Sequence, residues 1–195
     1  MSTVPKSKWY ILVACIASSI PASGQPPVNK SPPLVCTIAG PPTCESGKLP
    51  AIAITVANWS DGDIHLVGSL DGSDCKWRYP HCYFEVIGPD GKPAVKNVLR
   101  CKFTNPLTET DFVAVPRGGK CDLGVGPAAQ LPADIFGTEG EYRIRFVYST
   151  DSADIKSWLG SGVASEKLGV LLAKVPKVAV SSNEITVKVG KPKKE

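Results

Sequence analysis

The chain has 195 residues, of which 43% are hydrophobic and 21% are charged. This balance excludes a multi-span membrane protein and a wholly disordered chain. The 22 Lys and Arg residues and the 18 Asp and Glu residues give a net charge of +4, which is too small and too dispersed for a nucleic-acid footprint. Gly and Pro occur 18 times each, which indicates many turns between short elements and favours an all-β domain.

The N-terminal segment has the features of an export signal. Lys6 and Lys8 precede an apolar run over residues 9–20, and small residues follow before Gln25. The run is shorter than the roughly 20 apolar residues that a bilayer span requires, so no transmembrane segment is expected to remain after signal removal. We therefore predict a signal peptide over residues 1–24 and a secreted or periplasmic protein.

A lipid anchor is the alternative for the same segment. Leu12-Val13-Ala14-Cys15 resembles a bacterial lipobox, in which Cys15 would become the acylated first residue of a lipoprotein. The apolar run before Cys15 is shorter than the usual signal core, which favours ordinary cleavage. The domain is exported under either alternative.

Cysteine usage is also typical of an exported chain. An even number of cysteines follows the predicted signal, which predicts disulfide bonds: Cys36, Cys44, Cys75, Cys82, Cys101 and Cys121. The sequence leaves the connectivity open. A predicted hairpin favours a Cys82–Cys101 bond, and a short loop favours Cys36–Cys44. Cys75 would then remain for Cys121. No CxxC pair occurs, so a zinc site is not expected.

Alternating apolar side chains predict short strands along the domain. We expect a Pro-rich leader over 25–34, the domain over 35–190 and a basic tail over 191–195. Asp90-Gly91 marks a hairpin turn, because Gly tolerates the positive φ that such turns need. Seven to nine short strands are typical of an antiparallel β-sandwich. The predicted strands lie within 50–58, 64–70, 83–87, 95–103, 111–115, 142–148 and 185–189.

Three short segments carry a resemblance to a known family. Gly140-Glu141-Tyr142-Arg143-Ile144-Arg145 resembles the penultimate strand of an immunoglobulin-like sandwich, with Tyr142 at the tyrosine-corner position. Trp158-Leu159-Gly160 and the stretch 182–187 resemble the close of exported bacterial immunoglobulin-like domains. The likeness spans roughly residues 49–189 and lacks the Cys-Trp-Cys spacing of antibody domains. The resemblance implies an immunoglobulin-like fold and a non-enzymatic role.

Known catalytic patterns do not occur in the sequence. It has no G-x-S-x-G elbow, no H-E-x-x-H pair and no P-loop, and we interpret His65 and His81 as structural. Four carboxylates lie in Gly-containing loops and are typical of turns, with a weak calcium site as the alternative: Asp61, Asp63, Asp71 and Asp74. We therefore expect no enzyme activity, no cofactor and no metal.

A binding surface is predicted at one end of the sandwich. If 50–58 and 142–148 are strands B and F, the loops that follow them emerge at the same end, and each loop carries a tryptophan. The segment 75–82 is expected at the opposite end. In the alternative interpretation each tryptophan packs under its own loop. The candidate binding residues, an aromatic and polar set, are Trp59, Asp61, Asp63, Lys156 and Trp158.

Two further features bear on surface and function. The segment 161–182 is long for a connection between two strands, and its apolar residues predict an edge strand or a short helix that covers the sandwich. Its alternative role is a docking surface. Asn29-Lys30-Ser31 and Asn58-Trp59-Ser60 also fit the N-glycosylation pattern, which has meaning only if the source is a eukaryote.

Three functions follow from this sequence. The favoured one is a non-catalytic, secreted or periplasmic binding module whose partner is a protein or glycan of the cell envelope or extracellular space. The first alternative is a proteinase-inhibitor-like sandwich that uses the loop 75–82. The second is a secreted hydrolase that uses loop carboxylates.

Overall fold

The computed structural model describes residues 33–70, 73, 75–95, 105–123 and 131–191. The chain divides into two units, Met1–Lys30 and Ser31–Glu195, and every described residue belongs to the second. Strand makes up 38% and helix 13%, and the strands pair antiparallel except for one short parallel pair, so the expected all-β class is confirmed. The predicted signal peptide and Cys15 lie outside the described residues, as do most of the leader and most of the basic tail.

One sheet consists of three strands in the order β1-β3-β7. These strands are β1 (Leu34–Ala39), β3 (Ala53–Asn58) and β7 (Lys120–Asp122), and β3 pairs antiparallel with both neighbours. The predicted alternation in β3 is present, because Ile54 and Val56 are buried while Ala53 is exposed. β1 begins inside the segment that we expected to be leader.

A second sheet is built around β8 (Gly140–Ser149), the longest strand. β8 pairs antiparallel with β5 (His81–Ile87), β9 (Ala179–Ser181) and β10 (Ile185–Gly190). The short β2 (Thr43–Glu45) adds to β10 in parallel. Along β8, the side chains of Tyr142, Ile144 and Phe146 are buried and those of Arg143 and Arg145 are exposed, which confirms the predicted alternation.

The remaining elements are short. β4 (Ile64–Val67) and β6 (Phe112–Val115) form an antiparallel pair, and two 3-10 turns, η1 (Glu109–Asp111) and η3 (Ala133–Phe136), precede β6 and β8. Two helices, α1 (Lys156–Leu159) and α2 (Glu166–Ala173), follow β8. No helix of the described residues has the length and apolar character needed to span a bilayer.

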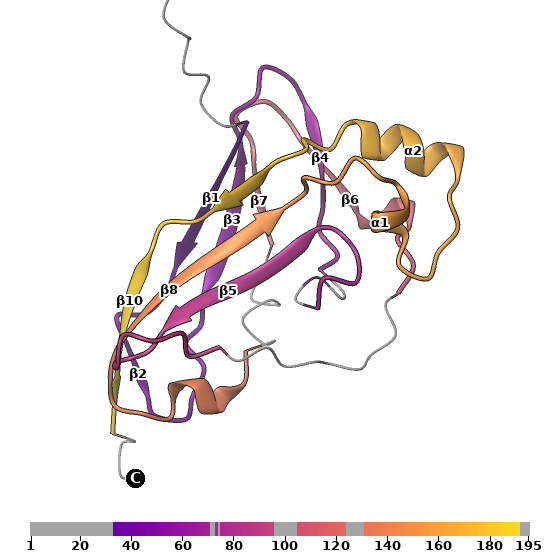
Figure 1. The fold of residues 1–195 in the computed structure, drawn as a ribbon. Coiled ribbons are helices and arrows are strands. Elements are labelled where there is room, and N and C mark those ends of the chain that lie inside the picture. The colour runs from indigo at the N-terminus through magenta and orange to yellow at the C-terminus, as the bar shows by residue number, and fades with distance from the viewer. Residues whose placement is uncertain (1–32, 71–72, 74, 96–104, 124–130, 192–195) are drawn as a thin grey trace, which may run out of the picture. The chain divides into compact units, whose positions relative to one another are not determined.

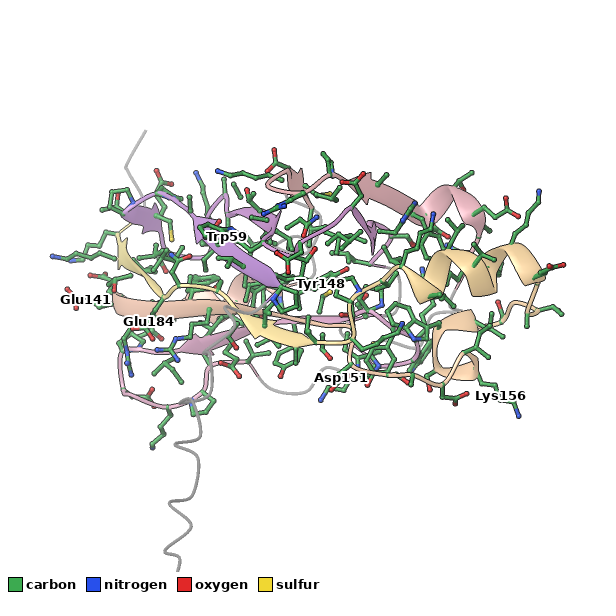
Figure 2. The ribbon with its side chains drawn as sticks, turned by 90° about the horizontal axis from the view of Figure 1, so that it is seen from above. Trp59, Glu141, Tyr148, Asp151, Lys156 and Glu184 are labelled. Atoms are coloured by element: carbon green, nitrogen blue, oxygen red, sulfur yellow. The ribbon has the colours of Figure 1, made fainter. Side chains whose placement is uncertain are left out.

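The main core lies between the two sheets, and Figure 2 shows side chains filling the space between the layers of strands. Aromatic pairs lie on the inner side of β8: the rings of Phe84 and Phe146 are 5.0 Å apart, and those of Phe136 and Tyr142 are 5.1 Å apart. Inward residues of β1, β3, β5, β8 and β10 therefore share one apolar cluster.

A second, smaller core lies beneath the two helices. α2 starts at Ser165, whose side-chain oxygen accepts a hydrogen bond from the Leu168 amide, and it buries Leu168 and Leu172 on one face. These two side chains pack with Trp158 and Val175 in a cluster that is separate from the main core. We expected either an edge strand or a short helix in segment 161–182, and it contains a helix, α2, and a short strand, β9, that pairs with β8 (Figure 1).

The hairpin turn at Asp90-Gly91 is confirmed, with Gly91 at a φ of 76°. The Gly88 amide donates to the Lys92 carbonyl oxygen at 2.8 Å, and Ile87 forms an isolated bridge with Pro93. The predicted return strand 95–103 lies almost entirely outside the described residues, and so does Cys101.

The described cysteines do not form the predicted disulfides. Cys36, Cys44 and Cys121 are free thiols, which leaves the expected Cys36–Cys44 and Cys75–Cys121 pairs unformed. The chain crosses from one sheet to the other between β1 and β2, which separates Cys36 from Cys44. Cys36 and Cys121 flank Val56 on opposite sides of β3, so two strand spacings of about 4.8 Å lie between them, more than a disulfide can span.

Candidate functional site

The loop 58–63, which we call the Trp59 loop, is held by the buried side chain of Asn58. The Asn58 side-chain nitrogen donates to the carbonyl oxygens of Gly62 at 2.9 Å and Val115 at 3.0 Å. Its side-chain oxygen accepts from the Ser60 amide at 2.9 Å and from the Ser60 hydroxyl at 2.6 Å. Asn58 therefore uses its full hydrogen-bonding capacity inside the fold. In the folded chain the acceptor nitrogen of this N-glycosylation pattern is therefore buried and engaged.

Three of the predicted binding residues are exposed on this loop. Trp59 keeps 65% of its surface in solvent, and Asp61 and Asp63 are exposed as well. The Asp63 carboxylate accepts a hydrogen bond from the Arg117 amide at 3.0 Å, which ties the loop to the turn before β7. An exposed tryptophan on an anchored loop can contact a partner at little cost in conformational entropy.

Trp158 is buried inside the molecule, as in the alternative interpretation of the sequence. It is 1% exposed, and its indole N–H donates to the Ser152 carbonyl oxygen at 3.1 Å. Lys156, two residues earlier at the start of α1, is exposed. Figure 2 shows Lys156 well apart from Trp59. The five predicted residues therefore do not form one surface.

A row of aromatic and cationic side chains adjoins Trp158. Tyr79 stacks on His81 with ring centroids 3.7 Å apart, and its ring lies 5.3 Å from that of Trp158. On the Trp158 ring, the Lys177 ammonium lies 4.4 Å from the centroid. We expected Tyr79 at the opposite end, which is wrong. β5 begins where the antiparallel β8 ends, so the residues before β5 and after β8 emerge together.

Asp151 completes this row at the end of β8 (Figure 2). Its carboxylate accepts from the Ser149 hydroxyl at 2.8 Å, and this bond together with one from the Tyr79 hydroxyl lowers the Asp151 pKa. Burial lowers the pKa of His81, and the positive charge of Lys76 lowers it further. His81 is therefore neutral near pH 7 and acts as a flat stacking partner for Tyr79.

An open groove, which we call the Trp158 groove, lies between α2 and the segment 153–155. It has a volume of about 240 Å³. Its walls are apolar, from Ile155 and Trp158 on one side and from Leu172 and Ala173 on the other. Lys177 is the one charged residue in this lining.

Lys177 is held in the groove by two contacts. Its ammonium nitrogen donates to the Leu172 carbonyl oxygen at 3.2 Å and faces the Trp158 ring. Burial lowers the pKa of Lys177, as expected for an ammonium group that has lost part of its water shell. The groove therefore presents a partly desolvated cation next to apolar surface.

Gly169 forms part of the groove in the middle of α2. A Cβ atom added there would meet nothing within 4 Å, so packing does not require glycine at this position. Glycine costs a helix interior about 1 kcal/mol relative to alanine. A helix-weakening residue that leaves open space in the groove is consistent with a site kept free for a ligand.

No protein-family model matches the chain, and no curated protein is found as a relative. In the part of the chain that the structure describes, no group of three or more His, Cys, Asp or Glu side chains is arranged to hold a metal ion. The functional assignment therefore depends on the geometry of the Trp158 groove and the Trp59 loop.

Sequence reasoning missed Tyr79, His81, Asp151 and Lys177 as members of the groove and its aromatic row. Tyr79 and His81 carry no motif, and only the β5–β8 pairing brings them to Trp158. Lys177 follows a proline in a segment that we interpreted as a cover for the sandwich. The signal that could have found it is an isolated lysine directly after an apolar stretch.

Proposed function

We propose that the chain is an exported, non-catalytic, immunoglobulin-like binding module that takes a ligand in the Trp158 groove. The observation that carries this proposal is the groove itself, in which one partly desolvated ammonium group adjoins apolar walls. Ligand sites in proteins are mostly apolar and contain few polar groups that fix orientation.

The strand order supports the immunoglobulin-like architecture. In that fold strands A, B, E and D form one sheet and strands C, F and G the other. With β1, β3 and β7 as A, B and E, the order A-B-E agrees with the first sheet. With β5, β8 and β10 as C, F and G, the order C-F-G agrees with the second.

The start of β8 supports the same architecture. The Tyr142 hydroxyl donates to the Thr138 carbonyl oxygen at 3.0 Å, four residues upstream, as in a tyrosine corner. Two residues after this tyrosine, where antibody domains have a cysteine, the chain has the fully buried Ile144. An apolar contact would then take the place of the inter-sheet disulfide.

A binding role is favoured over a catalytic one by the composition of the groove lining. General acid–base catalysis needs a titratable group within hydrogen-bond reach of a reacting atom, usually with a partner that sets its pKa. Lys177 is the single titratable side chain in the lining, and it is already held by a carbonyl oxygen and an indole.

The inhibitor alternative has less support in the segment 75–82. A protease-binding loop must present its side chains outward, but Arg78 is 1% exposed and Pro80 is buried. Only Trp77, at 45%, is an exposed large hydrophobic residue in this segment.

Export and a macromolecular partner stay part of the proposal. Export depends on the charged and apolar pattern of residues 1–24, with lipidation at Cys15 as the alternative. The exposed Trp59 supports a contact with a protein or glycan of the cell envelope or extracellular space. If Trp59→Ala abolishes binding to such a partner and leaves the Tm unchanged, the proposed contact at Trp59 is supported.

Saturation-transfer NMR with a library of small metabolites tests the groove. The wild-type chain is compared with Gly169→Leu, which fills the groove, and with Gly169→Ala, which leaves most of it open. We expect ligands that bind the wild type and the alanine variant but not the leucine variant. Ligands that bind all three chains equally, or none that bind any, would contradict the proposal.

A further inference from the structure

We propose that the ligand of the Trp158 groove is a small aliphatic carboxylate, with its chain along α2 and its carboxylate paired with Lys177. This inference rests on the proposed function, because it names the ligand class of the same site. It follows from the charge of the groove, the shape of its floor and its volume.

The charge of the groove favours an anionic ligand. Lys177 brings one positive charge into the lining, and the lining contains no carboxylate to neutralise it. The nearby Asp154 carboxylate is used elsewhere, because it accepts from the Lys156 amide at 3.1 Å and the Ser157 hydroxyl at 3.2 Å at the start of α1. The Lys177 ammonium has three N–H donors, and one of them donates to the Leu172 carbonyl oxygen. A ligand carboxylate can accept a hydrogen bond from another.

The floor of the groove requires a slender apolar body. Gly169 and Ala173 lie four residues apart on α2, so they are neighbours on one helix face, and neither projects a large side chain. Ala153 is equally small on the opposite wall. An unbranched alkyl chain can lie along these residues and contact Leu172 without displacing a side chain.

The volume limits the ligand to a short chain. Drug-sized ligands occupy sites of about 300–1,000 Å³. The Trp158 groove, at about 240 Å³, is smaller and open to solvent. A carboxylate of about eight non-hydrogen atoms, such as hexanoate, matches this space, and the efficiency of small ligands then gives a Kd of about 1 mM.

The test uses hexanoate, hexan-1-ol and hexylamine, which share one alkyl chain and differ in charge. Binding is followed by the indole N–H NMR signal of Trp158. This signal is distinguished with Trp59→Phe and Trp77→Phe, the two exposed tryptophans among the described residues, and with Trp9→Phe. We expect hexanoate to bind at least tenfold more tightly than hexan-1-ol, and hexylamine not to bind. Loss of a charge-assisted hydrogen bond commonly costs about a factor of ten or more.

Substitutions of Lys177 give an independent arm. Lys177→Gln is expected to weaken hexanoate to the level of hexan-1-ol and to leave hexan-1-ol unchanged, while Lys177→Arg keeps the preference. Lys174→Gln is the matched control, because Lys174 and Lys177 are both exposed lysines that follow α2 and only Lys177 lines the groove. If Lys177→Gln fails to fold, the comparison of the three wild-type ligands still decides the inference.

The outcomes separate this inference from the proposed function. Equal binding of hexanoate and hexan-1-ol, or an unaffected preference in Lys177→Gln, would overturn the carboxylate and leave the groove as a ligand site. If none of the three probes binds, the carboxylate is also overturned. The proposed function then depends on whether the metabolite screen gives ligands that Gly169→Leu abolishes.

Discussion

At the scale of single residues, the core buries polar groups whose ionisation opposes folding. Burial raises the pKa of the Cys36 thiol to about 12, from a usual value of 9.0. A pKa that is raised in the folded state stabilises the fold fully below pH 9, and this contribution is lost as the pH rises toward 12. Burial also raises the pKa values of Cys82 and Tyr148, so both groups add to this loss of stability at alkaline pH.

The pH dependence of Cys36→Ala tests this account in the reduced protein. Below pH 9 the variant is expected to be less stable than the wild type by about 1–2 kcal/mol, because it leaves a small cavity. Toward pH 12 this difference shrinks, since alanine cannot ionise. Urea unfolding at pH 7 to 12 measures it. A difference that stays constant with pH would contradict the raised pKa.

Asn58 is the residue on which the Trp59 loop depends. Replacing it by alanine leaves buried donors and acceptors without partners, which is expected to lower the free energy of unfolding by about 2–3 kcal/mol. Denaturant unfolding measures the loss. Asp61→Ala, an exposed change in the same loop, is the control and should stay within about 0.5 kcal/mol of the wild type. A similar cost for both variants would contradict the role given to Asn58.

At the scale of elements, alternation in the sequence predicts the strands that face the main core. β3, β8 and β10 were predictable because each has one buried and one exposed face. β1 was missed because the prolines before it suggested an extended leader, and β2 because its three residues are too few for a period to appear. The aromatic row was not predictable, since it depends on which strand ends lie side by side.

Within α2, the substitution Gly169→Ala changes the helix propensity and leaves most of the Trp158 groove open. Gly169→Ala is expected to raise the free energy of unfolding by up to about 1 kcal/mol, because alanine has the higher helix propensity and its Cβ meets no neighbour. Thermal unfolding followed by circular dichroism measures the gain. A lower stability would mean that the fold requires glycine at this position, and an unchanged stability would contradict the expected gain from helix propensity.

At the scale of the whole described unit, two apolar clusters differ in size. The cluster between the sheets includes most inward residues of the long strands, whereas the cluster around Trp158 holds a short helix and its flanking loops. Elements with few buried contacts open more readily than the strands of a core. The groove is therefore placed on the part of the fold that opens at the lower free energy, where a ligand can stabilise it by binding.

Hydrogen exchange distinguishes the two clusters. In the wild type, the amides of α2 are expected to exchange faster than those of β8. Trp158→Ala removes a side chain that is 1% exposed, at a cost of about 3–5 kcal/mol. It should accelerate exchange in α2 by about two orders of magnitude or more and leave the centre of β8 much less affected.

Phe146→Ala, a change of similar cost in the main core, should accelerate both elements together, because β8 opens only when the unit unfolds. Equal acceleration of β8 by both variants would mean that the fold has a single cooperative core, and the helices would then be as stable as the sheets that they follow.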